Sequence, residues 1–238
     1  MKVALMITCM GDSLRPDVGK ATARLLRRLG HEVVFPLEQT CCGQPFHNSG
    51  FADMARAQAR YTINVFREDV PVVTPSGSCA AMVKIEYPHL LKDDDAWSAR
   101  AKALADRTFE LTDFLVNRVK TTDVGARFEG KVAFHYACHL RMLGVANEPE
   151  TLIRQVQGAT YVPLDLVEQC CGFGGSFSVR YPEISSAMVG SKVDCLERTE
   201  ADAVTSTDLG CLTNIEGASR RRAKPLRFLH IAELLESQ

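Results

Sequence analysis

Eight of the nine cysteines in this chain follow one pattern that occurs twice. In each copy a single cysteine is followed by a Cys-Cys-Gly sequence and then by another single cysteine. Adding 129 to the first three cysteine positions gives the corresponding positions of the second copy. The two sets are Cys9, Cys41, Cys42 and Cys79, and Cys138, Cys170, Cys171 and Cys211. The repetition indicates two thiolate sites on a duplicated fold.

Four thiolates are a usual ligand set for a soft metal ion or an iron–sulfur cluster. Zinc ligands usually come in pairs about two to four residues apart, whereas each copy here has two adjacent cysteines. Adjacent thiolates can bind different irons, so the pattern favours a cluster, with zinc in one or both sites as the alternative. Gly43 and Gly172 permit the positive φ that a sharp turn at each cysteine pair needs.

A third possibility is thiol–disulfide chemistry at the adjacent cysteines. Neighbouring cysteines form strained, reducible disulfides, so Cys41-Cys42 or Cys170-Cys171 could exchange with a substrate disulfide. No spacing supports a Ser-His-Asp triad. The glycines between Gly172 and Gly175 match neither of the common phosphate-loop sequences and are a weak signal for phosphate.

The composition is that of an ordinary soluble protein, with 46% hydrophobic and 24% charged residues. The net charge of -1 gives no reason to expect nucleic acid as a partner. No apolar run is long enough to span a membrane, and the N-terminal segment lacks the features of a secretory signal. We therefore expect a cytoplasmic protein, in which clustered cysteines bind metal or do redox chemistry more often than they form disulfides.

Other candidate residues are expected to have simpler roles. His139 and His47 follow a cysteine motif closely, and we expect them to line loops, with contact to the centre as the alternative. His135 lies in a predicted strand and is expected to pack there. Ser76 and Ser78 suit a tight turn and could donate hydrogen bonds to a thiolate. The unpaired Cys195 has no counterpart in the first copy; it shares a helical face with Ile184 and Met188, so we interpret it as a core residue.

Short apolar runs alternate with helical patterns in both halves, which predicts an α/β fold of two tandem βαβαβ repeats with parallel sheets flanked by helices. Predicted strands are 2–8, 31–36, 71–79, 131–138, 160–164 and 201–211, and predicted helices are 18–29, 51–66, 149–156 and 182–198. A further helix is expected to close each half, at 108–119 and 228–237. The expected repeats are 1–120 and 131–238, joined by a linker at 121–130.

Each cysteine motif directly follows a predicted strand. Ligands of open parallel sheets bind at the carboxyl ends of the strands. We therefore expect the four cysteines of each half to converge on one edge of its sheet, which makes two sites of four thiolates.

The sequences TCCGQPFHNSG, TPSGSC, EYPHL, ELTDF, CCGFGGSFSV and HIAELL occur in this order along the chain. They resemble the cysteine-rich, or CCG, domain family, which includes the cysteine-rich component of heterodisulfide reductase and the iron–sulfur component of glycolate oxidase. The resemblance is closest to the lactate-utilization members of this family and covers nearly the whole chain.

The resemblance implies a cytoplasmic electron-transfer component of an oxidoreductase complex that converts L-lactate to pyruvate. It also implies two partner proteins from lactate utilization, one of them an iron–sulfur protein. By resemblance, each set of four cysteines would bind one centre, most simply a 4Fe-4S cluster.

The chain departs from heterodisulfide reductase at one position in each half. There the last cysteine belongs to a C-x-x-C pair that supplies a fifth thiolate to a non-cubane cluster. In this chain the corresponding residues are Met82 and Asn214. The sequence therefore predicts a four-thiolate cluster, or a metal ion in one half. A structural zinc protein that assembles the complex and a thiol-redox protein remain the alternative functions.

Overall fold

The computed structural model describes residues 1–7, 9–222 and 226–238, and within these residues the strands form two four-stranded parallel sheets. The strand order is β2-β1-β3-β4 in the first half and β6-β5-β7-β8 in the second. The strands of the first sheet are β1 (Lys2–Leu5), β2 (Glu32–Val34), β3 (Val72–Thr74) and β4 (Thr108–Glu110). Those of the second are β5 (Arg127–Phe134), β6 (Gln157–Val162), β7 (Ala203–Ser206) and β8 (Arg227–His230).

The two sheets have the same topology and equivalent pairing of their central strands. Ala4 of β1 lies opposite Val72 of β3, and Ala133 of β5 lies opposite Val204 of β7. Every residue of β3 and β7 is buried, which is why these strands are short apolar runs without alternation. The predicted α/β fold of two repeats with parallel sheets is confirmed.

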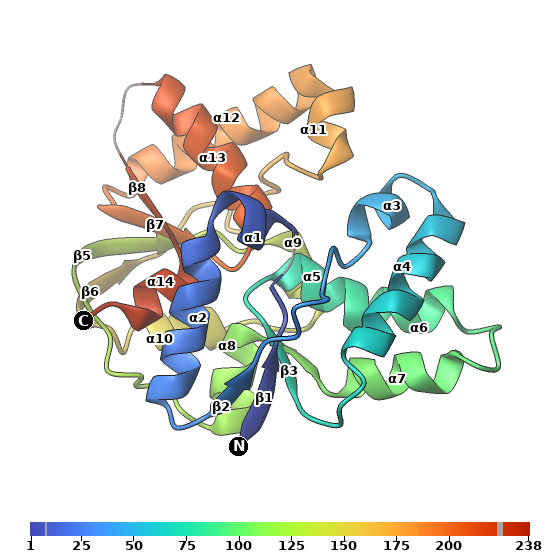
Figure 1. Ribbon diagram of the computed structural model, residues 1–238. Coiled ribbons are helices and arrows are strands. Elements are labelled where there is room, and N and C mark those ends of the chain that lie inside the picture. The colour runs from blue at the N-terminus through green and yellow to red at the C-terminus, as the bar shows by residue number, and fades with distance from the viewer. Residues whose placement is uncertain (8, 223–225) are drawn as a thin grey trace.

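Helices join and cover the strands in both halves (Figure 1). In the first half they are α1 (Cys9–Leu14), α2 (Pro16–Arg28), α3 (Gln44–Asn48), α4 (Ala52–Val65), α5 (Gly77–Ala81), the π-helical η1 (Met82–Glu86), α6 (Tyr87–Leu90), α7 (Ser98–Asp106), α8 (Leu111–Asp113) and the π-helical η2 (Phe114–Val119). In the second half they are α9 (Cys138–Met142), α10 (Glu148–Ile153), α11 (Ser176–Arg180), α12 (Pro182–Arg198), α13 (Leu209–Arg221) and α14 (Ile231–Glu236).

Each half has a fourth strand that the sequence pattern does not reveal. The predicted closing helices at 108–119 and 228–237 begin with β4 and β8, and only their later parts are helical. Strands of three and four residues are too short to display an alternating pattern, and the helical periodicity that follows hides them. Similarly, β5 begins at Arg127, within the segment 121–130 that the sequence predicts to be a linker.

Other element boundaries differ from the predictions by a few residues. Strand β1 ends at Leu5, short of the predicted 2–8, and Thr8 lies outside the described residues. Helix α2 begins at Pro16, two residues before the predicted start, because proline is well suited to the first turn of a helix. Helix α12 covers the predicted 182–198 and also begins with a proline.

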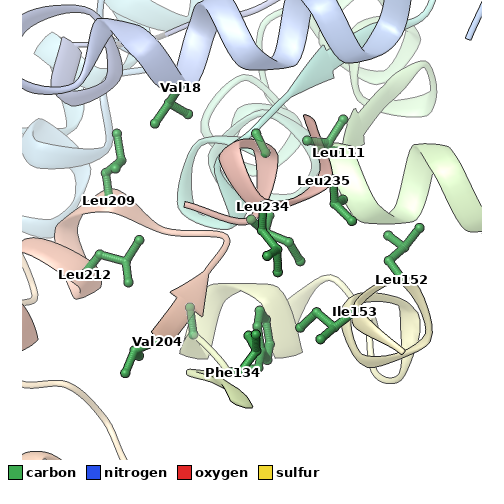
Figure 2. Close-up of a cluster of buried hydrophobic side chains, with 14 of the residues drawn as sticks. Val18, Leu111, Phe134, Leu152, Ile153, Val204, Leu209, Leu212, Leu234 and Leu235 are labelled. Carbon is green, nitrogen blue, oxygen red and sulfur yellow. The ribbon is translucent and has the colours of Figure 1, made fainter. Parts of the chain in front are cut away.

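The two halves share one hydrophobic core. Helices α2 and α14 lie side by side between the sheets (Figure 1), where Arg24 Nε pairs with Glu236 Oε1 at 2.7 Å. Buried side chains from both halves meet around these helices, including Val18, Leu111, Phe134, Leu152, Val204 and Leu234 (Figure 2). Each such side chain contributes about 1.5–3 kcal/mol on burial. The shared core therefore fixes the two sheets relative to each other.

Candidate metal centre

The single cysteines of the duplicated pattern stand in the first turns of helices that follow the central strands. Cys9 begins α1 after β1, and Cys138 begins α9 after β5. Cys79 lies in α5 after β3, and Cys211 lies in α13 after β7. The Cys-Cys-Gly sequences follow β2 and β6. All eight cysteines therefore lie at the carboxyl edges of the two sheets, as the sequence predicts.

The structure also brings the two sheet edges together. All eight cysteines line one cavity of about 200 Å³ between the halves. Other residues of its wall include Met6, Ile7, Gln44, His139, Phe173 and Asp208. The expected two sets of thiols therefore open into one common space.

In the first half the thiols are held by a tight turn. Gly43 has a φ of 87°, and its backbone N–H donates to Cys41 Sγ at 3.4 Å. Cys9 Sγ lies 3.7 Å from Cys41 Sγ. Hydrogen bonds from the thiols of Cys42 and Cys9 lower the pKa of Cys41 to about 3. The Cys41 sulfur thus accepts hydrogen bonds that favour its thiolate form.

The second half repeats this arrangement. Gly172 has a φ of 78°, and its N–H donates to Cys170 Sγ at 3.4 Å. Cys171 Sγ and Cys211 Sγ are 2.9 Å apart. Hydrogen bonds from the thiols of Cys138 and Cys171 lower the pKa of Cys170 to about 2. In both halves the glycine has the positive φ that the sequence predicts, and its amide stabilises a thiolate.

This donor set fits a soft metal or an iron–sulfur centre. No disulfide joins the cysteines in the described part of the chain, so their sulfur atoms are available as ligands. Two thiolates on one tetrahedral metal with bonds of about 2.3 Å are separated by about 3.8 Å. The 3.7 Å between the sulfurs of Cys9 and Cys41 is close to this value.

Hydrogen bonds between the halves surround the cavity. The hydroxyl of Ser78 donates to Asp208 Oδ1 at 2.7 Å, and the Ser78 N–H donates to Asp208 Oδ2 at 2.8 Å. Gln44 Nε2 lies 2.8 Å from His139 Nε2. Burial raises the pKa of Asp208. These contacts fix the two cysteine sets in their mutual positions.

The serines take part in the turn that the sequence predicts for them. Ser76 Oγ accepts the backbone N–H of Cys79 and so caps α5. Ser78 is directed to Asp208 of the other half. The sequence could not show this because the partner of Ser78 is 130 residues away.

The histidines differ in their relation to the thiols. His139 lines the cavity, and its Nδ1 lies 3.7 Å from Cys138 Sγ. His47 instead faces Glu86, with 3.4 Å between Nε2 and Oε2. His135 lies directly after β5 and is buried, as the sequence predicts for a packing residue. A ring nitrogen also lies within 4.8 Å of the sulfurs of Cys171 and Cys211. Burial lowers the pKa of His135 to about 3, which keeps the ring neutral.

Lys192 is a residue of this region that the sequence does not single out. Its side chain is fully buried in α12, and its Nζ donates to the carbonyl oxygen of Leu166 at 2.9 Å. Burial lowers its pKa, while the thiols of Cys195, Cys171 and Cys170 favour its charged form. A lysine on an amphipathic helix is ordinarily exposed, so the burial of Lys192 can be recognised only from the tertiary packing.

The remaining cysteine and the residues that replace a fifth thiolate have structural roles. Cys195 is buried in the shared core, which confirms its interpretation, although Ile184 on the expected common face is 55% exposed. Met82 is buried in a second hydrophobic core within the first half. Asn214 Nδ2 donates to the carbonyl oxygen of Cys171 at 2.8 Å. Neither position supplies a thiolate.

Comparison with known proteins identifies the family of the chain. The family model "Cysteine-rich domain" (CCG) matches residues 3–84 and 132–216, one match in each half. Proteins named lactate utilization protein A are similar over their whole length. The one from Bacillus licheniformis is 51% identical over 100% of both chains, and the one from Anoxybacillus flavithermus is 50% identical over 99% of both. The one from Bacillus subtilis is 48% identical over 100% of both.

Solved structures show only a weak likeness. Glutamate racemase from Francisella tularensis is 10% identical, with a TM-score of 0.37 over 99% of this chain and 77% of that one, and supports no conclusion. Among the described residues, no helix combines the length and apolar character needed to cross a bilayer. The family match in both halves and the full-length relatives show that the chain belongs to the cysteine-rich CCG domain family.

Proposed function

We propose that this chain is an iron–sulfur electron-transfer component of a complex that oxidises L-lactate to pyruvate. The observation that carries the proposal is the convergence of eight cysteines on one cavity between the halves. Their sulfur atoms supply two sets of four thiolates, which suits one or two 4Fe-4S clusters. The link to lactate rests on the similar proteins named lactate utilization protein A.

An iron–sulfur centre supplies one-electron transfer, and the protein sets its reduction potential through hydrogen bonds, charge and burial. In this chain the N–H groups of Gly43 and Gly172 donate to cysteine sulfurs and stabilise negative charge there. Apolar side chains such as Met6 and Phe173 line the cavity, and four of its cysteines are buried, namely Cys42, Cys79, Cys171 and Cys211. The site thus holds charge in an environment that is partly shielded from water.

The proposal includes two other lactate-utilization proteins as partners, one of them an iron–sulfur protein, in the cytoplasm. Exposed apolar side chains on α1 and α11 support a docking surface, since both helices contribute residues to the cavity wall. Leu14 of α1 is 59% exposed and Val179 of α11 is 80% exposed. A partner bound there would come close to the cysteines.

A structural zinc site is the second candidate, because the sulfur separation at Cys9 and Cys41 suits a single tetrahedral ion. Iron, zinc and acid-labile sulfide should be measured in anaerobically purified protein, and lactate should be added in the presence of both partners. We expect iron with equal sulfide and a lactate-dependent EPR signal. Stoichiometric zinc without iron would establish the structural role instead.

A further inference from the structure

We propose that His135 is a metal ligand of the second half, so that this centre has mixed thiolate and imidazole ligation while the first has thiolates alone. This inference rests on the proposed function, because it assumes that the cysteines hold iron. It deepens that function by making the two centres chemically different.

The position of His135 is the first argument. A ring nitrogen of His135 and the sulfurs of Cys171 and Cys211 all lie within 4.8 Å of one another, and all three residues are buried. The backbone N–H of His135 donates to Thr205 O at 2.8 Å, which extends the pairing of β5 with β7. The imidazole is therefore held beside two candidate ligands by the sheet itself.

The second argument is that the ring is unsatisfied. His135 is 1% exposed, and neither ring nitrogen has a hydrogen-bond partner among the described residues. Leaving a buried polar group unpaired costs about 1–3 kcal/mol. A metal ion between the imidazole and the two sulfurs would satisfy one nitrogen. His31 is also buried without a hydrogen-bond partner there, but it packs against Phe114 at a ring distance of 5.6 Å rather than beside thiols.

The first half supplies the contrast. Met6 donates its backbone N–H to Val73 O at 2.9 Å, as His135 does to Thr205. The two residues are separated by the same 129 positions as the cysteine sets, so they occupy equivalent sites. A methionine thioether is a weaker donor for iron than an imidazole nitrogen. Of the two equivalent positions, only that of the second half therefore supplies an imidazole ligand.

The chemistry of such a centre follows from its charge. If the neutral imidazole takes the place of one of the four thiolates, the centre carries less negative charge than a four-thiolate centre, and this raises its reduction potential. Either ring nitrogen of His135 is available for a metal, because neither takes part in a hydrogen bond among the described residues. We therefore expect the second centre to be the more easily reduced of the two.

The test uses the whole protein, purified without air and reduced with dithionite. Protein is prepared with natural-abundance and with 15N-labelled histidine, and nitrogen couplings of the EPR signals are measured by ENDOR. We expect a coupling of directly bonded nitrogen that changes with the label. The substitution His135→Met, which copies the residue of the first half, should abolish this coupling. His139→Asn and His47→Asn are the controls and should retain it.

The outcomes separate this inference from the proposed function. Iron-containing protein without any bonded histidine nitrogen, or a coupling that persists in His135→Met, overturns the inference and leaves the iron–sulfur function intact. Protein that binds no iron under these conditions overturns both. If His135→Met does not fold, the labelled wild-type protein and the gain of a second coupling in Met6→His still decide the question.

Discussion

The two halves hold their cysteines in the same way but surround them differently. Both have a Cys-Cys-Gly turn with a glycine amide directed to the first cysteine sulfur. Beside the thiols, the first half has Met6 where the second has His135. The duplicated frame therefore fixes the cysteines, and the neighbouring side chains distinguish the two sites.

A second difference lies in the helices that cover the turns. The buried positions of α4 recur in α12 with a spacing of 130, since Ala55, Ala59 and Thr62 match Ser185, Val189 and Lys192. A hydroxyl in the first half is thus replaced by an ammonium group in the second. A nearby positive charge stabilises the reduced, more negative state of a centre. The second centre should therefore be reduced first, as its histidine also implies.

The largest expected effect is the loss of one centre. Cys42→Ser and Cys171→Ser should each remove roughly half of the bound iron, because each breaks the ligand set of one half only. Cys195→Ala is the matched control and should keep all the iron, since Cys195 packs in the core. Iron analysis checks this. Intact iron with loss of thiol exchange in Cys42→Ser or Cys171→Ser would favour the thiol-redox alternative.

The stability that the buried Glu110 contributes should fall as pH rises. It ends β4, and burial raises its pKa to about 7 from an ordinary 4.5. The folded protein therefore keeps a proton that the unfolded chain releases, so this contribution is complete below pH 4.5 and is lost as pH rises through 7. The change is about 3 kcal/mol. Urea unfolding across this range should show that the free energy of unfolding of the natural protein falls with pH. The fall should be much smaller in Glu110→Gln.

His230 occupies the equivalent position at the end of β8 and should act in the opposite direction. Both residues have φ -69° and ψ 149° and accept a backbone N–H at the start of a helix. Burial lowers the pKa of His230 to about 4 from an ordinary 6.5. Its contribution, also about 3 kcal/mol, is present above pH 6.5 and is lost as pH falls through 4. In the same unfolding series, His230→Asn should reduce the fall in the free energy of unfolding at acid pH. An unchanged fall would contradict the role given to His230.

Removal of the buried charge in the second half should shift one potential. A unit charge several ångströms away is worth about 2 kcal/mol at an effective dielectric of about 20, which corresponds to on the order of 80 mV for one electron. Lys192→Met should lower the potential of the second centre by this order and leave the first unchanged. Thr62→Val, the matched change in the first half, should affect the second centre little. Redox titration of both variants measures the difference.

The smallest expected effect concerns the two turn glycines. Alanine at a positive φ costs about 1–2 kcal/mol in either half. At Gly172 the added Cβ would lie 2.7 Å from the carbonyl oxygen of Ser185, whereas at Gly43 it would lie 3.0 Å from the flexible side chain of Gln58. Gly172→Ala should therefore destabilise the protein by about 1–2 kcal/mol more than Gly43→Ala. Equal unfolding midpoints for the two variants would contradict this account.

The cysteine positions could be predicted because they depend on local rules. Each cysteine motif follows a strand, and the strands are parallel, so the sequence alone brings four thiols to each sheet edge. The positive φ of Gly43 and Gly172 follows from two adjacent cysteines that must turn toward one centre. The bounds of α12 follow from Pro182 and a long helical pattern.

The rest depends on packing between distant segments. The single cavity arises because α2 and α14 join the halves, and no local pattern indicates which faces of two helices will meet. Lys192 has the sequence context of an exposed lysine, and its burial is set by the segment around Leu166. The sequence assigns His135 to packing because the two sulfurs near it come from residues far along the chain.

Redox titration of the EPR signals, in natural protein and in Cys42→Ser and Cys171→Ser, tests the central claim most directly. The account predicts two signals at different potentials. Cys42→Ser should lose the signal that is reduced at the lower potential, and Cys171→Ser should lose the one reduced at the higher potential. Loss of both signals in either variant would show one shared centre, and the reverse order of potentials would contradict the assigned roles of His135 and Lys192.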